Sequence, residues 1–399
     1  MSPAMHDRVL NDLSHDRRII ITIISDAAGS ALKLFPAIIV AMYGVFGFFL
    51  SIGAFFILPG LSEAALSCLD SHGDPIDWFN LYKLPKKIST GLQYFVLTER
   101  DNDWRLSSDS IDDPLSIPGQ ILRQLTRDHV VLMYNDEPPE GETDGTRGHT
   151  KGVIATDAES GFWLIHSVPK YPSGLGTAYM YPKTGTIYGQ SFLCVTFNAT
   201  EMDTIGLQLM MNEPHLYEIN LPEKLKEVFP NLVRASNMMR ITTPPFWRVE
   251  ELKSRNGSIF RSFAKSAKFQ KELYTDWVAP TLGATLMVES WLHGPGRLES
   301  NCSLQFGVFN LRDIIIHLNG NTTSFRTLDD HSKWAVSLGE QDWICVGDIN
   351  RSEHQKVRGG GTLCRWDKKV ATAYRNAILD YYPCPDISQN SSENYSENY

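Results

Sequence analysis

The sequence predicts a globular protein that contains both strands and helices and is divided into two related halves. Residues 149–151 read His-Thr-Lys, and residues 331–333 read His-Ser-Lys, 182 positions later. Each phrase begins an apolar, strand-like run, which is followed by a polar turn and a second strand-like run. A repeat with a period near 180 residues indicates two halves rather than a solenoid.

The two His-x-Lys phrases predict a shared phosphate site. His149 and Lys151 are two positions apart, as are His331 and Lys333, so on a strand each pair points to one face. Two such strands facing each other would gather two imidazoles and two ammonium groups. These groups suit a phosphodiester, because cations bind the phosphate oxygens while one histidine attacks and the other protonates the leaving oxygen. His-x-Lys alone is a weak pattern, and coincidence is the alternative.

The second strand of each hairpin ends in polar residues. His166 stands 17 residues after His149, and Asp348 stands 17 after His331, with Asn350 two further on. His166 either orients its neighbours or contacts the phosphate. Asp348 either fixes an imidazole tautomer or bonds only to backbone. Asn350 also begins a glycosylation sequon, and a glycan is not expected there if the residue lies in the pocket.

The remaining elements follow from apolar periodicity and from Gly and Pro punctuation. Helical patterns span residues 119–127, 202–212, 222–229 and 262–278. Strand patterns span residues 77–85, 91–98, 130–134, 149–156, 162–168, 186–197, 286–292, 304–310, 314–318, 331–336 and 343–349.

Two stretches have alternative interpretations. The predicted amphipathic helix 262–278 carries Lys265, Lys268 and Lys271 at helical spacing, either as a solvated basic face or as contacts to a phosphate backbone. Residues 358–362 form a glycine-rich loop, which either lets the backbone approach a ligand or is a plain tight turn.

Composition limits the class of protein. The 399 residues are 42% hydrophobic and 11% aromatic, enough for a large core. The formal charge of -9 is unusual for a protein that binds nucleic acid at neutral pH. Either the positive charge is local, or the protein works at acid pH, where its eleven histidines become charged.

Cysteines and sequons indicate the secretory pathway. The even number of cysteines, six, predicts three disulfides, for which 15 pairings exist. Asn-x-Ser/Thr sequons begin at Asn198, Asn256, Asn301, Asn321, Asn350, Asn390 and Asn394, and the first four are the predicted glycosylation sites.

The N-terminal region predicts a targeting segment. Residues 1–36 form a largely polar extension, and residues 37–65 are a signal peptide or signal anchor. Cleavage near Ser62 is favoured over retention as an anchor, which would be the only membrane contact. Initiation at Met42 is a third interpretation, in which residues 1–41 are not made. Residues 386–399 are expected to be a disordered tail.

The ordered set of motifs across residues 66–384 resembles the deoxyribonuclease II family of acid endonucleases. The matching segments are 77–79, 82–85, 134–139, 148–152, 161–169, 188–195, 262–265, 330–334, 345–351 and 358–364. The resemblance implies an α/β fold similar to phospholipase D: a pseudo-dimer of two α/β halves, each a mixed sheet flanked by helices. One active site would be shared by halves at roughly 66–215 and 216–385.

The resemblance also implies the chemistry. It implies metal-independent cleavage of double-stranded DNA at acid pH, leaving 3′-phosphate and 5′-hydroxyl ends, in the degradation of engulfed, apoptotic or ingested DNA. The catalytic residues would be His149, His166, His331, Lys151 and Lys333, with no cofactor. The implied disulfides are Cys68–Cys194, Cys302–Cys384 and Cys345–Cys364. The protein is expected in lysosomes or phagolysosomes or outside the cell, with its oligomeric state left open.

We assign His149 as the nucleophile, forming a phosphohistidine, and His331 as the general acid. An acid optimum follows, because the acid must be protonated and free histidine titrates near ~6.5. Three rivals remain: zinc bound by His149, His166 and His331, a lipid phosphodiesterase with an acyl channel, and a catalytically silent binding protein of the same fold.

Overall fold

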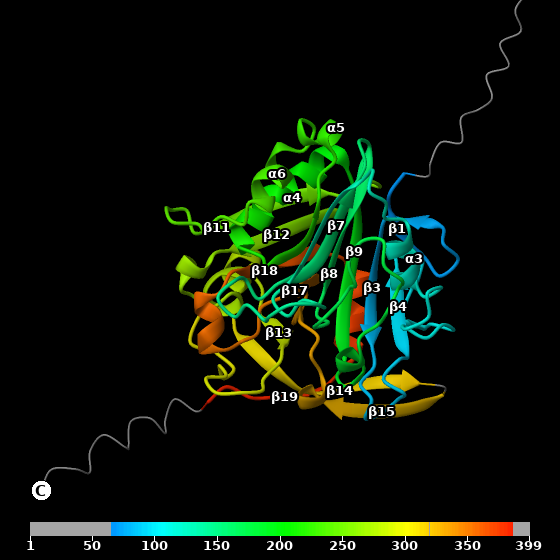
Figure 1. Cartoon of the computed structure of the whole chain (residues 1–399). Helices are drawn as coiled ribbons and strands as arrows, with labels where there is room; N and C mark the ends of the chain where they lie inside the picture. Colours follow the sequence, from blue (N-terminus) through cyan, green and yellow to red (C-terminus); the bar gives the residue numbers. More distant parts are fainter. Residues whose placement is uncertain (1–64, 319, 386–399) are drawn as a thin grey trace, which may run out of the picture. The chain divides into compact units, whose positions relative to one another are not determined.

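The computed structural model describes residues 65–318 and 320–385, and these form an α/β protein with two large sheets flanked by a few helices (Figure 1). The first sheet is antiparallel throughout. Its strands, in spatial order, are β10 (Leu216–Asn220), β6 (Val130–Asn135), β7 (Lys151–Thr156), β8 (Ser160–His166), β9 (Gln190–Asn198), β3 (Trp78–Lys83), β4 (Tyr94–Thr98) and β5 (Arg105–Leu106).

The second sheet is mixed, because β13 and β14 run parallel. Its strands, in spatial order, are β11 (Trp247–Lys253), β12 (Ile259–Lys265), β18 (Gly360–Trp366), β17 (Trp343–Gly347), β16 (Trp334–Ser337), β13 (Leu286–Glu289), β14 (Val308–Leu318) and β15 (Asn321–Arg326), with β19 (Ile378–Tyr381) also paired to β14. A small ribbon joins β1 (Cys68–Leu69) to β2 (Pro75–Ile76).

The internal repeat recurs in the topology of the two sheets. The spatial order β6-β7-β8-β9-β3 in the first sheet matches β13-β16-β17-β18-β12 in the second. Within each set the chain visits the corresponding strands in the same order. The two His-x-Lys phrases therefore precede equivalent strands, β7 and β16.

A hydrophobic cluster shared by both sheets joins them. It combines Trp163 and Val195 of the first sheet with Trp334 and Leu363 of the second. The outer faces carry their own clusters, so the central strands are buried on both sides. That explains their near-continuous apolar sequences.

Helices cover the sheets and are mostly short. Helix α4 (Ala199–Asn212) packs against strands of both sheets and against α6 (Pro230–Ser236) (Figure 1). Helix α8 (Lys368–Asn376) packs on β16 and β17, and its N-cap Asp367 accepts from the N–H of Val370. The helical segments are α3 (Ile117–Arg123), α4 (Ala199–Asn212), α5 (Glu223–Lys226), α6 (Pro230–Ser236), α7 (Ala279–Leu282) and α8 (Lys368–Asn376), with short turns η2 (Lys183–Thr186), η3 (Ala267–Phe269), η4 (Tyr274–Val278), η5 (Thr327–Asp329) and η6 (Glu353–Val357).

Both predicted hairpins are confirmed, as β7–β8 and β16–β17. The helix predicted over residues 262–278 is wrong. That stretch contains the end of β12, then η3 and η4, and Lys265 is fully buried rather than on a solvated face. Strand β12 is held between β11 and β18, which are distant pairings that a helical lysine spacing does not reveal.

The six cysteines pair as Cys68–Cys194, Cys302–Cys384 and Cys345–Cys364, as the resemblance implied. The predicted N-terminal segment and C-terminal tail lie outside the described residues. Within residues 65–318 and 320–385, no helix has the length and apolar character needed to cross a bilayer.

A buried arginine near the end of β17 gives a stability prediction. The Arg351 guanidinium is 1% exposed and donates to the side chains of Asn310 and Thr275, with its Nε 3.6 Å from Glu272. We expect Arg351→Met to lower the free energy of unfolding by about 3 kcal/mol, because it leaves the buried Glu272 carboxylate uncompensated. Urea unfolding measures this loss. The double variant with Glu272→Gln should recover part of it, and equal losses in both variants would contradict the pairing.

Candidate active site

The backbones of the two His-x-Lys histidines are fixed by opposite halves of the chain. The N–H of His149 donates to the carbonyl of Gly359 at 2.9 Å. The N–H of His331 donates to the carbonyl of Gly189, also at 2.9 Å. Each histidine lies just before its strand, β7 or β16, so its position depends on a loop from the other sheet.

The two imidazole rings are oriented in the same crossed way. Nδ1 of His149 lies 2.7 Å from the carbonyl oxygen of Asp348, and Nδ1 of His331 lies 2.8 Å from that of Ser167. A carbonyl oxygen only accepts, so each Nδ1 carries a proton. Nε2 of each neutral ring is therefore left with the lone pair that a nucleophile or base needs.

The lysine of each phrase is buried. Lys151 forms an ion pair with Asp136, whose other oxygen is 2.9 Å from the Arg358 guanidinium. Burial alone would raise the pKa of Asp136, but the charges of Lys151, His149 and Arg358 hold it well below its usual range. Lys333 donates to the carbonyl of His331 at 2.6 Å. The site thus has one lysine with a carboxylate partner and one bonded to a carbonyl.

The charges of this cluster act on one another. Burial lowers the pKa of His149 and His331 well below 6.5, and the neighbouring lysines Lys151 and Lys333 lower both further. Burial and the charge of Lys151 lower the pKa of Lys333 to about 7. The structure therefore brings the four residues of the two phrases into one electrostatic site, as the sequence predicted.

His166 lies at the end of β8 and is 1% exposed. Its Nδ1 accepts from the N–H of Val168 at 3.2 Å, so Nε2 carries the proton. Nε2 is buried with no hydrogen-bond partner among the described residues. Burial lowers the pKa of His166 to about 3, so the ring is a neutral donor at any working pH.

Asp348 orients His149 through its backbone carbonyl and not through its carboxyl group, an arrangement that differs from both predicted roles, which concerned the carboxyl group. Burial raises the pKa of the Asp348 carboxyl to about 8. Asn350 is also buried, so its sequon is not exposed. Within the described residues, Oδ1 of Asp348 and Oδ1 of Asn350 have no hydrogen-bond partner.

Two charged residues of the site were missed at the level of sequence. Asp136 and Arg358 lie inside the matching segments 134–139 and 358–364, and their place in these segments was the signal that could have identified them. Gly359 and Gly361 pack against protein backbone, and Gly360 packs against the side chains of Ile349 and Thr150, instead of opening to a ligand. A Cβ at Gly359 would lie 2.2 Å from the carbonyl oxygen of Asn212, at the end of α4, and β18 begins at Gly360.

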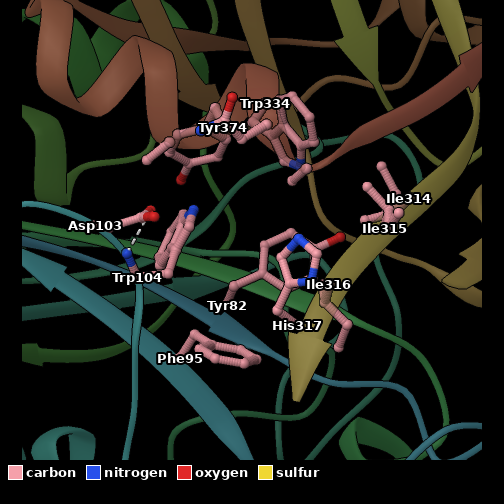
Figure 2. Close-up of a pocket in the computed structure, with 13 residues that line it drawn as sticks. Tyr82, Phe95, Asp103, Trp104, Ile314, Ile315, Ile316, His317, Trp334 and Tyr374 are labelled. Carbon is pink, nitrogen blue, oxygen red and sulfur yellow. Dashed lines mark hydrogen bonds between the residues drawn. The ribbon is translucent and has the colours of Figure 1, made fainter. Parts of the chain in front are cut away.

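An apolar cavity of about 110 Å³ lies elsewhere, and Figure 2 shows the aromatic side chains around it. Tyr82, Trp104, Trp334 and Tyr374 contribute to its wall, while none of the predicted catalytic residues does. The described residues contain no group of three or more His, Cys, Asp or Glu side chains placed to hold a metal ion.

Two sheets that share one cluster of imidazoles and ammonium groups define an enzyme-type site for an anionic phosphate ester. The chain belongs to the deoxyribonuclease II family: the family described as Deoxyribonuclease II matches residues 67–384.

Curated relatives agree with this membership. The chain is 36% identical to Plancitoxin-1 of Acanthaster planci, over 82% of this chain and 95% of that protein. It is 37% identical to Deoxyribonuclease-2-alpha of Sus scrofa, over 80% and 91%. It is 34% identical to Cell death-related nuclease 6 of Caenorhabditis elegans, over 82% and 92%.

Proposed function

We propose that this protein is an acid endodeoxyribonuclease that hydrolyses phosphodiester bonds of double-stranded DNA. The observation that carries the proposal is the crossed pair His149 and His331, each with Nδ1 bound to a carbonyl and Nε2 left as the reactive atom. The names of the relatives, deoxyribonucleases and a nuclease, support DNA as the substrate.

The reaction proceeds in two steps on these residues. Nε2 of His149 attacks phosphorus and forms a phosphohistidine, while Nε2–H of protonated His331 gives its proton to the departing 5′ oxygen. His331 then takes a proton from water, which attacks phosphorus and releases the 3′-phosphate. Lys151 and Lys333 stabilise the charge on the phosphate oxygens, and the buried Nε2–H of His166 is a further donor to them.

Acid pH favours three states that the reaction needs. His331 must be protonated, and its lowered pKa requires an acidic medium. Lys333, with its pKa of about 7, is an ammonium group below that value. Asp348, with its pKa of about 8, is neutral and does not repel the phosphate. Raising the pH reverses all three, so activity falls toward and above neutrality.

The two halves act as a phospholipase D-like pseudo-dimer in this proposal. The matched strand order of the two sheets and the reciprocal backbone contacts of His149 and His331 support it.

The proposed location is the lysosome, the phagolysosome or the extracellular space. The three disulfides suit an oxidising compartment. Of the four predicted glycosylation sites, Asn198, Asn256 and Asn321 are exposed and Asn301 is half-buried. Release by a glycosidase of glycans from the protein isolated from cells tests this route.

One experiment tests the function. The purified protein and its His331→Ala variant are incubated with plasmid DNA at pH 5 and pH 7.5, with and without EDTA. We expect the unmodified protein to cleave at pH 5 in EDTA and much more slowly at pH 7.5, and the variant to be inactive. Inactivity of the unmodified protein at pH 5 contradicts the proposal. Loss of activity in EDTA alone would restore the zinc interpretation.

A further inference from the structure

Two lysines outside the catalytic set are fully buried. Lys83 ends β3, Lys265 ends β12, and both are 0% exposed. Among the described residues, neither forms an ion pair with a carboxylate; their ammonium groups donate to backbone carbonyls. A buried ammonium group without a carboxylate partner is unfavourable, so its position calls for a reason.

The carbonyls they bind lie in corresponding turns. Lys83 donates to Thr186 at 3.2 Å and to Tyr188. Lys265 donates to Gln355 at 3.0 Å, to Lys356 at 3.3 Å and to Arg358. These acceptors belong to or follow η2 and η6, and each turn leads into the strand that pairs with the lysine.

Each anchored turn ends in the glycine that holds a catalytic histidine. Gly189 follows Tyr188, and its carbonyl accepts the N–H of His331. Gly359 follows Arg358, and its carbonyl accepts the N–H of His149. The two arrangements are thus repeats of one another, and each crosses from one sheet to the histidine of the other.

We propose that Lys83 and Lys265 are positioning residues, each holding the turn that fixes the catalytic histidine of the opposite half, Lys83 for His331 and Lys265 for His149. The inference rests on the proposed function for the roles of the two histidines. An ammonium group has three donors and gathers several carbonyls at one point, which defines the path of the turn. A displacement of about 1 Å at a reacting group reduces rates by about 100-fold.

The charge state of the anchors agrees with work at acid pH. Burial lowers the pKa of Lys83 to about 7, partly offset by Asp330. Burial lowers the pKa of Lys265 to about 8, with Glu272 and Glu213 raising it and Arg358 lowering it further. At pH 5 both are therefore ammonium groups with three donors. Above neutrality Lys83 becomes an amine with two.

Lys83→Met and Lys265→Met test the inference, since methionine keeps the volume and removes the donors. We expect crossed effects on backbone amide hydrogen exchange. Lys83→Met accelerates exchange at His331 by at least about tenfold and leaves His149 unchanged, while Lys265→Met does the reverse. Arg365→Met, which removes another buried cation from β18, is the matched control and should affect neither amide.

Kinetics at pH 5 separate the two anchors. We expect each variant to lower kcat on plasmid DNA by about 10- to 100-fold with KM little changed. On a nucleoside 3′-(p-nitrophenyl phosphate), the p-nitrophenolate leaves without a proton. The first-turnover rate should then be normal in Lys83→Met, which disturbs the acid, and reduced in Lys265→Met, which disturbs the nucleophile.

The outcomes are distinct. Wild-type kcat in both variants, or exchange that accelerates equally at both histidines, overturns the inference while the proposed function stands. An unmodified protein that does not cleave DNA refutes the proposed function, and the exchange pattern still tests the anchors. Should Lys83→Met fail to fold, Lys83→Gln keeps two N–H donors on a shorter side chain, and its rate is expected between those of wild type and His331→Ala. A wild-type rate in Lys83→Gln counts against the inference.

Discussion

Replacing His149 by alanine is expected to reduce the rate of DNA cleavage at pH 5 by about 10⁴-fold or more, because the attacking Nε2 is lost. Initial rates on supercoiled plasmid measure the effect. The His149→Asn variant also lacks the attacking Nε2, but its side-chain amide N–H can still donate to the carbonyl of Asp348. It therefore separates the loss of the nucleophile from the loss of this contact. His72→Ala, which removes a histidine side chain that is 82% exposed, should retain full activity.

The assignment of nucleophile and acid has its own test. In His331→Ala, a p-nitrophenyl ester is still attacked because its leaving group needs no proton, but hydrolysis of the intermediate lacks its base. We expect a phosphoryl adduct on His149, detectable by mass spectrometry at alkaline pH after quenching. An adduct on His331 in the His149→Ala variant would show that the two roles are reversed.

Lys333→Met is expected to lower kcat/KM for DNA by about 10²- to 10³-fold, because one of the two cations proposed to stabilise the phosphate is lost. Lys333→Arg is the informative companion. Lys333, with a pKa of about 7, loses its charge as the pH rises, whereas a guanidinium stays charged. Above pH 7 the activity of Lys333→Arg should therefore fall less steeply than that of the unmodified protein, while the fall set by His331 at lower pH remains.

The control for these variants is Lys368→Met, at an exposed lysine that begins α8. It should leave both the rate and the pH profile unchanged. If Lys333→Met cleaves DNA at the wild-type rate, Lys333 does not face the phosphate. An unshifted profile in an active Lys333→Arg variant would mean that another group sets the fall in activity above pH 7.

Local pattern was sufficient for much of the fold. Both hairpins were predictable because apolar runs of strand length flank polar turns at residues 157–161 and 337–342. The stretch 262–278 was not, because the lysine spacing imitates a helix while β12 is decided by its pairing with β11 and β18. In this stretch the local helical pattern is overridden by tertiary strand pairing.

The candidate site likewise contains residues that a local sequence pattern predicts and contacts that only the folded structure shows. His149, Lys151, His331 and Lys333 were predicted from the repeated His-x-Lys phrase. The strand argument behind that prediction is wrong, because β7 begins only at Lys151 and β16 only at Trp334. The role of Asp348 was not, since its backbone carbonyl binds His149 while its carboxyl group remains without a partner for Oδ1 among the described residues. A contact made by a backbone carbonyl does not depend on the identity of the side chain, so the sequence carries no direct signal for it.

By itself, the sequence showed that the His-x-Lys phrase occurs in two copies, and it predicted that these residues carry the chemistry and that the protein follows the secretory route. Only the tertiary structure decided how the copies meet. The bonds that orient the imidazoles join His149 to Asp348 and His331 to Ser167, which are 199 and 164 residues apart. Buried Lys83 and Lys265 likewise contact turns about 100 and 90 residues away. Such contacts form only when both sheets have folded around their common core, so no local pattern of residues reveals them.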